Sequence, residues 1–143
     1  MVISDIDDTI KISNVRDKSE LMKNTFTEQF RAVPGMARLY RKMAEGGAVF
    51  HYVSASPWQL YRPLSAFLAR EGFPDGLFYM KSFGLAQNFS SLFADSGSVK
   101  MPFITELLAR FRDRRFILVG DTGESDPEMY GDCARLNPGS VLG

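Results

Sequence analysis

Short apolar runs alternate along this chain with longer segments in which apolar residues recur at helical spacing. The apolar runs lie at residues 1–6, 48–56, 76–80 and 115–120. Continuous apolar runs of this length are typical of strands that are covered on both faces of a sheet. The alternation of strands and helices predicts an α/β fold with a mostly parallel central sheet and helices on its faces.

The helix after the first polar segment is marked most clearly. Its apolar residues follow the spacing i, i+3, i+4 and i+7 from Met36, and Pro34 stands where the first helical residue is expected. The glycine pair at residues 46–47 stops it. Further helices are predicted to end at residues 71–72, with Pro63 either in the first turn or at a kink, to pass through residues 104–111, and to begin at Asp126 and Pro127.

Two polar segments interrupt this pattern. Residues 11–33 are weakly periodic, with only a modest helical tendency at residues 19–23, and form a candidate small cap insertion beside the core. Residues 82–98 are rich in Gly, Ser and Asn and predict a long loop. Neither segment is large, so a site that they cover would admit bulky or interfacial substrates more readily than a closed one.

The composition fits one domain and excludes some functions. The 143 residues include 17 Lys and Arg and 17 Asp and Glu, so no net basic charge attracts nucleic acid. The only cysteine, Cys133, has no partner for an internal disulfide, which favours a reducing, cytoplasmic setting. No apolar run approaches the roughly 20 residues that a membrane-spanning helix needs.

Polar residues with potential chemistry follow three of the predicted strands. The strings are DIDD at residues 5–8, SAS at residues 54–56 and GDTGESD at residues 120–126. A parallel sheet brings the carboxyl ends of its strands to one edge, where ligands bind. The carboxylates gathered there would be Asp5, Asp7, Asp121 and Asp126. Because like charges repel, this all-oxygen group indicates a cation, and Mg²⁺ suits it.

Each acidic string also has a simpler interpretation. Asp-rich turns are common after strands because the Asp side chain forms hydrogen bonds with its own backbone there. For residues 5–8 alone, such a turn and a functional site are equally good interpretations. A calcium-binding EF-hand loop is excluded, since Ile10 and Arg16 stand where that motif needs Gly and Glu. Asp126 before Pro127 fits a helix N-cap, which is compatible with metal binding because a carboxylate has two oxygens.

Four other side chains are candidates for binding or packing. Ser54 ends a buried strand, so its hydroxyl and the following N–H groups are suited to a phosphate oxygen. Ser56 is better explained as a helix cap. Lys100 near a helix start opposes the helix dipole, and taken alone it is a solvated lysine unless an anion lies nearby. Trp58 is interpreted as core packing in preference to a substrate wall.

The motifs, taken in order, resemble those of a known superfamily. DIDDT, a strand ending in Ser54, Lys100 and GDTGESD are similar to the four motifs of haloacid dehalogenase-like phosphohydrolases. The longer strings SDIDDTIK, SASPWQLY and FILVGDTGESDPEMY resemble the catalytic domain of the actin-patch-associated phosphatidate phosphatase family, which includes uncharacterised bacterial relatives. The resemblance covers nearly the whole chain. It implies a single catalytic domain over residues 1–143 with a Rossmann-like three-layer α/β/α sandwich and a minimal cap.

The resemblance assigns catalytic roles to four residues. Asp5 would be the nucleophile that attacks phosphorus and forms an aspartyl-phosphate. Asp7 would be the general acid that protonates the leaving alkoxide, and then the base that activates water. Ser54 and Lys100 would hold the phosphoryl oxygens.

It also implies a metal site. The residues expected to anchor Mg²⁺ are Asp5, Asp7, Asp121 and Asp126. Glu124 is expected to be an outer ligand of the metal, or to support one. Thr9 is expected to fix the turn, and Asp8 to be a turn residue or to support the site from outside it.

The chain differs from the usual family domain at both ends. Such domains carry sequence before the first motif and continue past the last helix with another strand. Residues 1–143 are therefore expected to be a fragment truncated at both ends, an abbreviated gene product or a minimal version of the domain.

The leading functional hypothesis is an Mg²⁺-dependent phosphomonoester hydrolase that converts phosphatidate to diacylglycerol and phosphate. The alternatives are a phosphatase of a soluble small metabolite and, ranked lower because Asp5 and Asp7 are both present, a non-catalytic metal-binding adaptor. The expected partner is a phosphorylated substrate, with phosphatidate at a membrane surface as the implied one, and no nucleic acid. The expected location is the cytoplasm, with peripheral contact to membranes.

Overall fold

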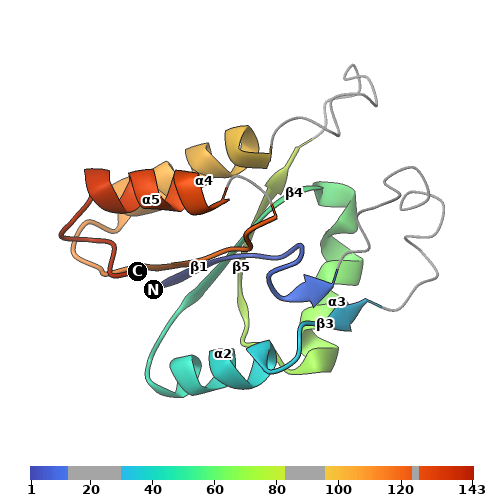
Figure 1. Ribbon diagram of the computed structural model, residues 1–143. Coiled ribbons are helices and arrows are strands. Elements are labelled where there is room, and N and C mark those ends of the chain that lie inside the picture. The colour runs from blue at the N-terminus through green and yellow to red at the C-terminus, as the bar shows by residue number, and fades with distance from the viewer. Residues whose placement is uncertain (13–29, 83–95, 124–125) are drawn as a thin grey trace.

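The centre of the molecule is a parallel sheet of four strands in the order β5-β4-β1-β6 (Figure 1). The computed structural model of the chain describes residues 1–12, 30–82, 96–123 and 126–143. The sheet strands are β1 (Val2–Asp5), β4 (Phe50–Pro57), β5 (Gly76–Lys81) and β6 (Ile117–Val119). The apolar runs thus form the strands that they predict, and the α/β class with a parallel sheet is confirmed.

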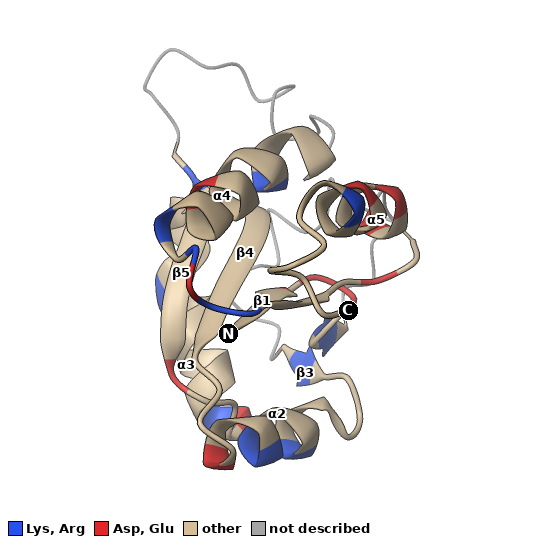
Figure 2. Cartoon of the chain, turned by 90° about the vertical axis from the view of Figure 1, so that its left-hand side faces the viewer, with Lys and Arg blue, Asp and Glu red and all other residues tan. Residues whose placement is uncertain are grey.

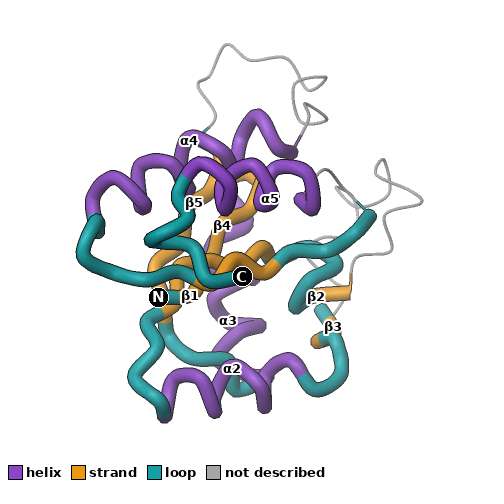
Figure 3. Tube along the Cα trace, turned by 60° about the vertical axis from the view of Figure 1, so that its left-hand side comes forward, coloured by secondary structure: helices purple, strands orange, loops and turns teal. Residues whose placement is uncertain are grey.

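Helices cover both faces of the sheet, which gives three layers (Figures 1 and 3). One face carries α2 (Met36–Glu45) and α3 (Tyr61–Glu71), the latter preceded by the 3₁₀ turn η2 (Trp58–Leu60), and the other carries α4 (Ser96–Arg110) and α5 (Asp126–Leu136). Basic and acidic residues, blue and red in Figure 2, both occur on α2, α4 and α5. This mixture agrees with the balanced composition.

The core consists of two clusters because neighbouring strand residues point to opposite faces. Val2 packs with side chains of α2 and α3, such as Tyr40 and Phe67, whereas Ile3 packs with side chains of α4 and α5, such as Ile104 and Met129. All these side chains are buried. Burial on both faces explains why the strands are continuous apolar runs.

The strand order places the first and the last strand of the sheet, β1 and β6, side by side. β1 pairs with β4 on one side and with β6 on the other, so that Val2 lies opposite both Phe50 and Ile117. The chain runs from β1 outward through β4 to β5 and then returns across the sheet to β6. A reversal of this kind leaves a crevice beyond the carboxyl ends of the strands, and that crevice is where ligands bind in open α/β sheets.

A small antiparallel pair lies beside this edge. β2 (Lys11–Ile12) pairs with β3 (Arg31–Ala32), so the two ends of the predicted cap segment lie together. Residues 13–29 lie outside the described residues, and with them the helical tendency predicted at residues 19–23.

Two predicted boundaries are wrong for physical reasons. Gly35 has a φ of 87°, a left-handed conformation that a helix cannot contain, so α2 begins at Met36 and Pro34 belongs to a turn. The predicted loop at residues 82–98 overlaps α4, which begins at Ser96 and contains Pro102. Residues 83–95 of that loop lie outside the described part of the chain.

The segment after β4 settles two further predictions. Pro63 lies in the first turn of α3, as one alternative held, because a missing N–H costs nothing there. Trp58 does not pack in the core: its side chain is 49% exposed and its ring stacks on Tyr61 with the centroids 5.0 Å apart. No helix among the described residues is long and apolar enough to cross a membrane.

Candidate active site

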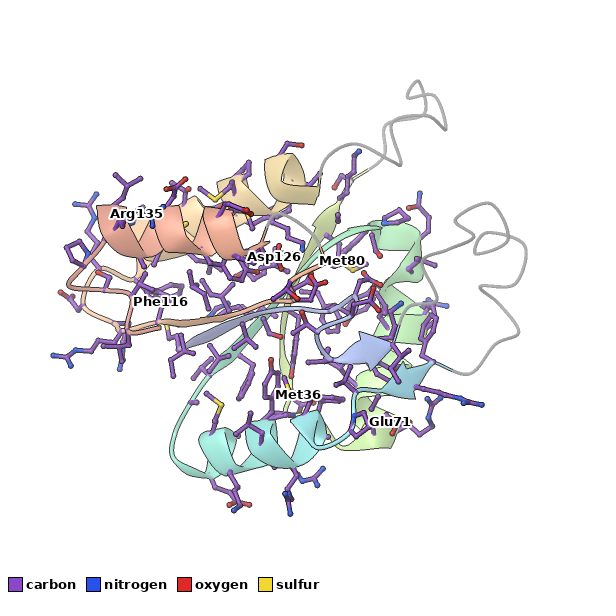
Figure 4. The ribbon with its side chains drawn as sticks, in the orientation of Figure 1. Met36, Glu71, Met80, Phe116, Asp126 and Arg135 are labelled. Carbon is purple, nitrogen blue, oxygen red and sulfur yellow. The ribbon has the colours of Figure 1, made fainter. Side chains whose placement is uncertain are left out.

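The three polar strings meet at the carboxyl edge of the sheet. Asp5 ends β1, Ser54 is the last fully buried residue of β4, and Asp121 follows β6. Asp126 lies at the start of α5, and Figure 4 shows it between that helix and the sheet. The predicted convergence is therefore what the fold produces.

A buried lysine joins two of these carboxylates. Lys100 Nζ lies 3.0 Å from Asp5 Oδ1 and 2.9 Å from Asp126 Oδ1. All three side chains are 1% exposed. Lys100 is the fifth residue of α4, so it reaches the sheet edge from the second turn of that helix. The two carboxylates supply the negative charge that a lysine near a helix start requires. The alternative prediction, that Lys100 is a solvated lysine, is wrong.

Burial and charge act in opposite directions on these groups. Burial raises the pKa of Asp5 to about 8, the ammonium of Lys100 opposes the rise, and the carboxylates of Asp7 and Asp126 add to it. For Lys100, burial lowers the pKa, but the two carboxylates outweigh burial and leave the pKa above its ordinary value. The lysine is therefore charged, whereas the negative charge around it is only partly balanced.

A third carboxylate completes an acidic group. Oxygen atoms of Asp5, Asp121 and Asp126 all lie within 4.8 Å of one another. Asp121 uses Oδ2 to accept a hydrogen bond from the backbone N–H of Gly123, at 2.8 Å. Its other oxygen, Oδ1, is buried and accepts no hydrogen bond from the part of the chain that the structure describes. Three carboxylates with such a buried oxygen fit a hard divalent cation. Glu124 lies outside the described residues.

Gly120 permits the approach of Asp126. A Cβ atom at position 120 would collide with Asp126 Oδ2 and would lie 2.7 Å from Cε2 of Tyr130. The hydroxyl of Tyr130 is also buried here, without a hydrogen-bond partner among the described residues. Burial, and to a smaller extent the charge of Asp126, raise the pKa of this hydroxyl. The glycine of the string GDTG is thus needed for close packing of the acidic group.

Asp7 lies beside this group with different contacts. Its Oδ1 lies 2.7 Å from Lys11 Nζ, and its Oδ2 accepts hydrogen bonds from the hydroxyls of Ser54 and Ser56, both at 3.2 Å. Asp7 is not in the acidic group that the structure brings together, although it was predicted with the metal ligands. The arrangement separates its carboxylate from the three that face one another.

The turn between β1 and β2 fixes these two aspartates. Asp8 has a φ of 57°, which Asp tolerates better than most residues, and its backbone N–H donates to the carbonyl of Lys11 at 2.7 Å. Thr9 donates its hydroxyl proton to Asp5 Oδ2 at 3.3 Å. Ser4 donates to the Asp5 carbonyl at 2.7 Å and lies 2.8 Å from the hydroxyl of Tyr40. The turn roles expected for Asp8 and Thr9 agree with this geometry.

Ser56 and Lys11 are the residues that the sequence reasoning missed. Ser56 was expected to cap a helix, but neither η2 nor α3 has a side-chain cap, and the hydroxyl turns to Asp7 instead. Lys11 is 4% exposed, an unusual burial for a lysine. A spacing of four residues after Asp7, in a segment that follows the apolar Ile10, was the signal that could have indicated it.

Comparisons with known proteins agree with these motifs. The family model described as "Phosphatidate phosphatase APP1, catalytic domain" matches residues 1–143. The chain is 34% identical over 145 residues to the phosphatidate phosphatase APP1 of Saccharomyces cerevisiae, an alignment that covers 99% of this chain and 24% of that protein. It is 31% identical over 147 residues to an uncharacterised protein of Schizosaccharomyces pombe, again with 99% and 24% covered. The chain thus spans about a quarter of the length of these curated relatives.

Proposed function

The chain belongs to the family of phosphatidate phosphatase APP1 catalytic domains, and on this premise we propose that it is an Mg²⁺-dependent phosphomonoester hydrolase. Its proposed substrate is phosphatidate, which it converts to diacylglycerol and phosphate. The observation that carries the proposal is the buried contact between Asp5, Lys100 and Asp126 at the carboxyl edge of the sheet, with Asp7 beside it. Two carboxylates with separate surroundings support separate roles for Asp5 and Asp7.

The acidic group formed by Asp5, Asp121 and Asp126 would hold the Mg²⁺ ion. Oδ1 of Asp121 supports this assignment, since it is buried, accepts no hydrogen bond from the described residues, and a buried oxygen needs a partner. When bound, Mg²⁺ supplies positive charge that offsets the charge of the phosphoryl group and of the carboxylates around it. The excess negative charge supports a cation, and a donor set made only of carboxylate oxygens suits a hard divalent cation such as Mg²⁺.

In the first step, a carboxylate oxygen of Asp5 attacks phosphorus, and the bond between phosphorus and the ester oxygen breaks. Asp7 gives its proton to the departing oxygen, which leaves as an alcohol, and the phosphoryl group remains on Asp5 as an aspartyl-phosphate. Lys100, 3.0 Å from Asp5, and the hydroxyl of Ser54 hold the phosphoryl oxygens. Most of the rate comes from this positioning and charge balance.

In the second step, Asp7 takes a proton from water, and the water oxygen attacks the phosphorus of the aspartyl-phosphate. The bond between phosphorus and Asp5 breaks, which releases inorganic phosphate and restores the carboxylate. Asp7 is then protonated again for the next cycle. The same carboxylate therefore serves as acid and base, and it must stay in one place through both steps.

Phosphatidate lies in membranes, so the proposed enzyme works at a membrane surface, and the cytoplasm is its proposed location. The test is hydrolysis of phosphatidate vesicles, of a soluble sugar phosphate and of an aryl phosphate, each with Mg²⁺ and with chelator. Wild type should release phosphate from phosphatidate only with Mg²⁺, and Asp5→Asn should lose at least about a thousandfold in kcat/KM because the nucleophile is gone. Release from soluble esters alone would replace the lipid with a metabolite. No release from any of them, or full activity of Asp5→Asn, would overturn the proposed mechanism.

A further inference from the structure

Lys11 is a buried lysine that contacts the site through Asp7. Its Nζ lies 2.7 Å from Asp7 Oδ1 and 4.8 Å from the ring centre of Phe30, the residue that precedes β3. The side chain of Lys11 is 5% exposed, whereas that of Asp7 is 30% exposed. Burying a charged lysine away from water costs free energy unless its ion pair has good geometry.

The backbone of Lys11 is fixed as firmly as its side chain. Lys11 pairs with Ala32 in the small antiparallel sheet, and its N–H donates to the carbonyl of Ile6 at 3.0 Å. Its carbonyl accepts the N–H of Asp8 at 2.7 Å. The ammonium therefore stands at a fixed place relative to the turn that carries Asp7.

The two oxygens of Asp7 face different groups. Oδ1 meets Lys11, and Oδ2 accepts from the hydroxyls of Ser54 and Ser56. Ser54 also accepts the backbone N–H of Ser56 at 3.0 Å. A phosphoryl group bound by the Ser54 hydroxyl takes that donor away from Oδ2. Lys11 and Ser56 would remain, and they hold Asp7 from two sides.

We propose that Lys11 and Ser56 are positioning residues that fix the Asp7 carboxylate so that Oδ2 is the oxygen that transfers the proton. Lys11 occupies Oδ1, which leaves Oδ2, the oxygen beside Ser54, to face the departing ester oxygen. Neither positioning residue touches the substrate. This inference rests on the proposed function, because it assigns work to Asp7 in that reaction.

Proton transfer to the leaving group can be separated from every other step. The substrate pair is phosphatidate and its analogue in which sulfur replaces the bridging ester oxygen. The sulfur leaves as a thiolate, which is far more stable than an alkoxide and needs no proton. The parameter is kcat/KM, since it includes only the steps up to departure of the leaving group.

Lys11→Met keeps the shape of the side chain and removes its charge. It should lower kcat/KM for the oxygen ester at least about tenfold, because general acid catalysis contributes about 100-fold or more, and should change the value for the sulfur ester less than about twofold. Ser56→Ala should show the same selectivity with a smaller loss. Lys42→Met, on the exposed face of α2, is the matched control and should change neither value.

Two outcomes for folded Lys11→Met would contradict the inference. Equal losses on both esters would show that Lys11 acts in binding or folding, and no loss on either would show that it does not act. If Lys11→Met does not fold, as judged by circular dichroism, the selectivity of Ser56→Ala decides. If the wild type cleaves neither ester, the proposed function itself is wrong. If the wild type is active but the variants lose activity equally on both esters, only the inference about Lys11 and Ser56 is wrong.

Discussion

The residues of the site are arranged for chemistry at the expense of stability. Asp5 and Asp126 share the single ammonium of Lys100, and Asp121 adds a third carboxylate within 4.8 Å. Buried charge of one sign that is only partly balanced opposes folding. The site should therefore be a place where the removal of charge stabilises the fold while it destroys the activity.

The free energy of unfolding of Asp5→Asn tests this opposition. Burial raises the folded-state pKa of Asp5 from 3.8 to about 8, so between these pH values the folded chain keeps a proton that the unfolded chain has released. Stability of the metal-free wild type therefore falls as pH rises through this window. The free energy of unfolding of Asp5→Asn should therefore exceed that of wild type by an amount that grows with pH. This excess should reach the order of a few kcal/mol and level off above about pH 8.

Urea unfolding in chelator at a series of pH values measures this difference. Asp132→Asn, which removes an exposed carboxylate that pairs with Arg135 on α5, serves as the control for the loss of a carboxylate outside the site. A difference between wild type and Asp5→Asn that does not change with pH would mean that the folded protein does not raise the pKa of Asp5.

Gly120→Ala should weaken the metal site without touching a ligand. The added Cβ would displace the Asp126 carboxylate, and support of this kind around a metal ligand is worth about 10–100-fold in affinity. Isothermal titration with Mg²⁺ measures the loss. Gly47→Ala is the comparison variant, since it strains the backbone far from the site and should leave affinity unchanged. Equal Mg²⁺ affinities for Gly120→Ala and wild type would show that Gly120 does not support the position of Asp126 at the metal site.

At the residue scale, sequence could indicate the charged ligands but not what holds them. Asp5 and Asp121 follow apolar runs, so their meeting at one edge follows from the fold class alone. Ser56 acts through a contact between separate segments, and no periodicity encodes such a contact. Lys11 lies only four residues from Asp7, but its burial also depends on pairing with β3, which is distant in the sequence. Ser56 stands where a helix cap is common, and only the tertiary structure shows that its hydroxyl turns to Asp7.

Among the elements, the end of α2 was predictable and the start of α4 was not. The end of α2 is local: the N–H of Gly47 donates to the carbonyl of Ala44 at 2.9 Å, and glycine is suited to that end. The first turn of α4 has the sequence Ser-Gly-Ser-Val, which consists of weak helix formers. What fixes the start of that helix is tertiary, since Lys100 on the next turn is bound to Asp5 and Asp126.

Gly47→Ala isolates the cost of the conformation that ends α2. Gly47 has a φ of 88°, and a Cβ at this position would meet nothing within 4 Å, so strain of the backbone is the only expected effect. The free energy of unfolding should fall by about 1–2 kcal/mol. Gly139→Ala is matched, because position 139 is equally open but has no positive φ. Thermal unfolding that shows the same small change for both variants would contradict the argument.

For the molecule as a whole, the site is a product of sheet order. β1 lies between β4 and β6, and this order alone brings Asp5 to the turn that carries Asp121. The general rules for alternating strands and helices reduce the possible strand orders to a few, and this order is one that they allow. The exposed Trp58 does not follow from them, because aromatic residues in an apolar context are usually buried.

Magnesium should stabilise the whole fold by mass action. A ligand that binds only the folded state at 100 times its Kd adds about 2.7 kcal/mol to the free energy of unfolding. Differential scanning calorimetry should show a rise in Tm with Mg²⁺ for wild type and little rise for Asp121→Asn. Asp132→Asn should respond like wild type, and an equal response of all three proteins would show that Mg²⁺ acts elsewhere.

The central place of β1 also bears on when the site can form during synthesis. Within these residues β1 precedes both of its neighbours in the sheet, and β6 comes much later in the sequence. Pairing between such distant segments slows folding, because the loops between them must be closed first. The carboxylates of Asp5 and Asp126 can meet only after α5 has left the ribosome. A nascent chain that has not yet reached α5 should therefore lack the acidic group.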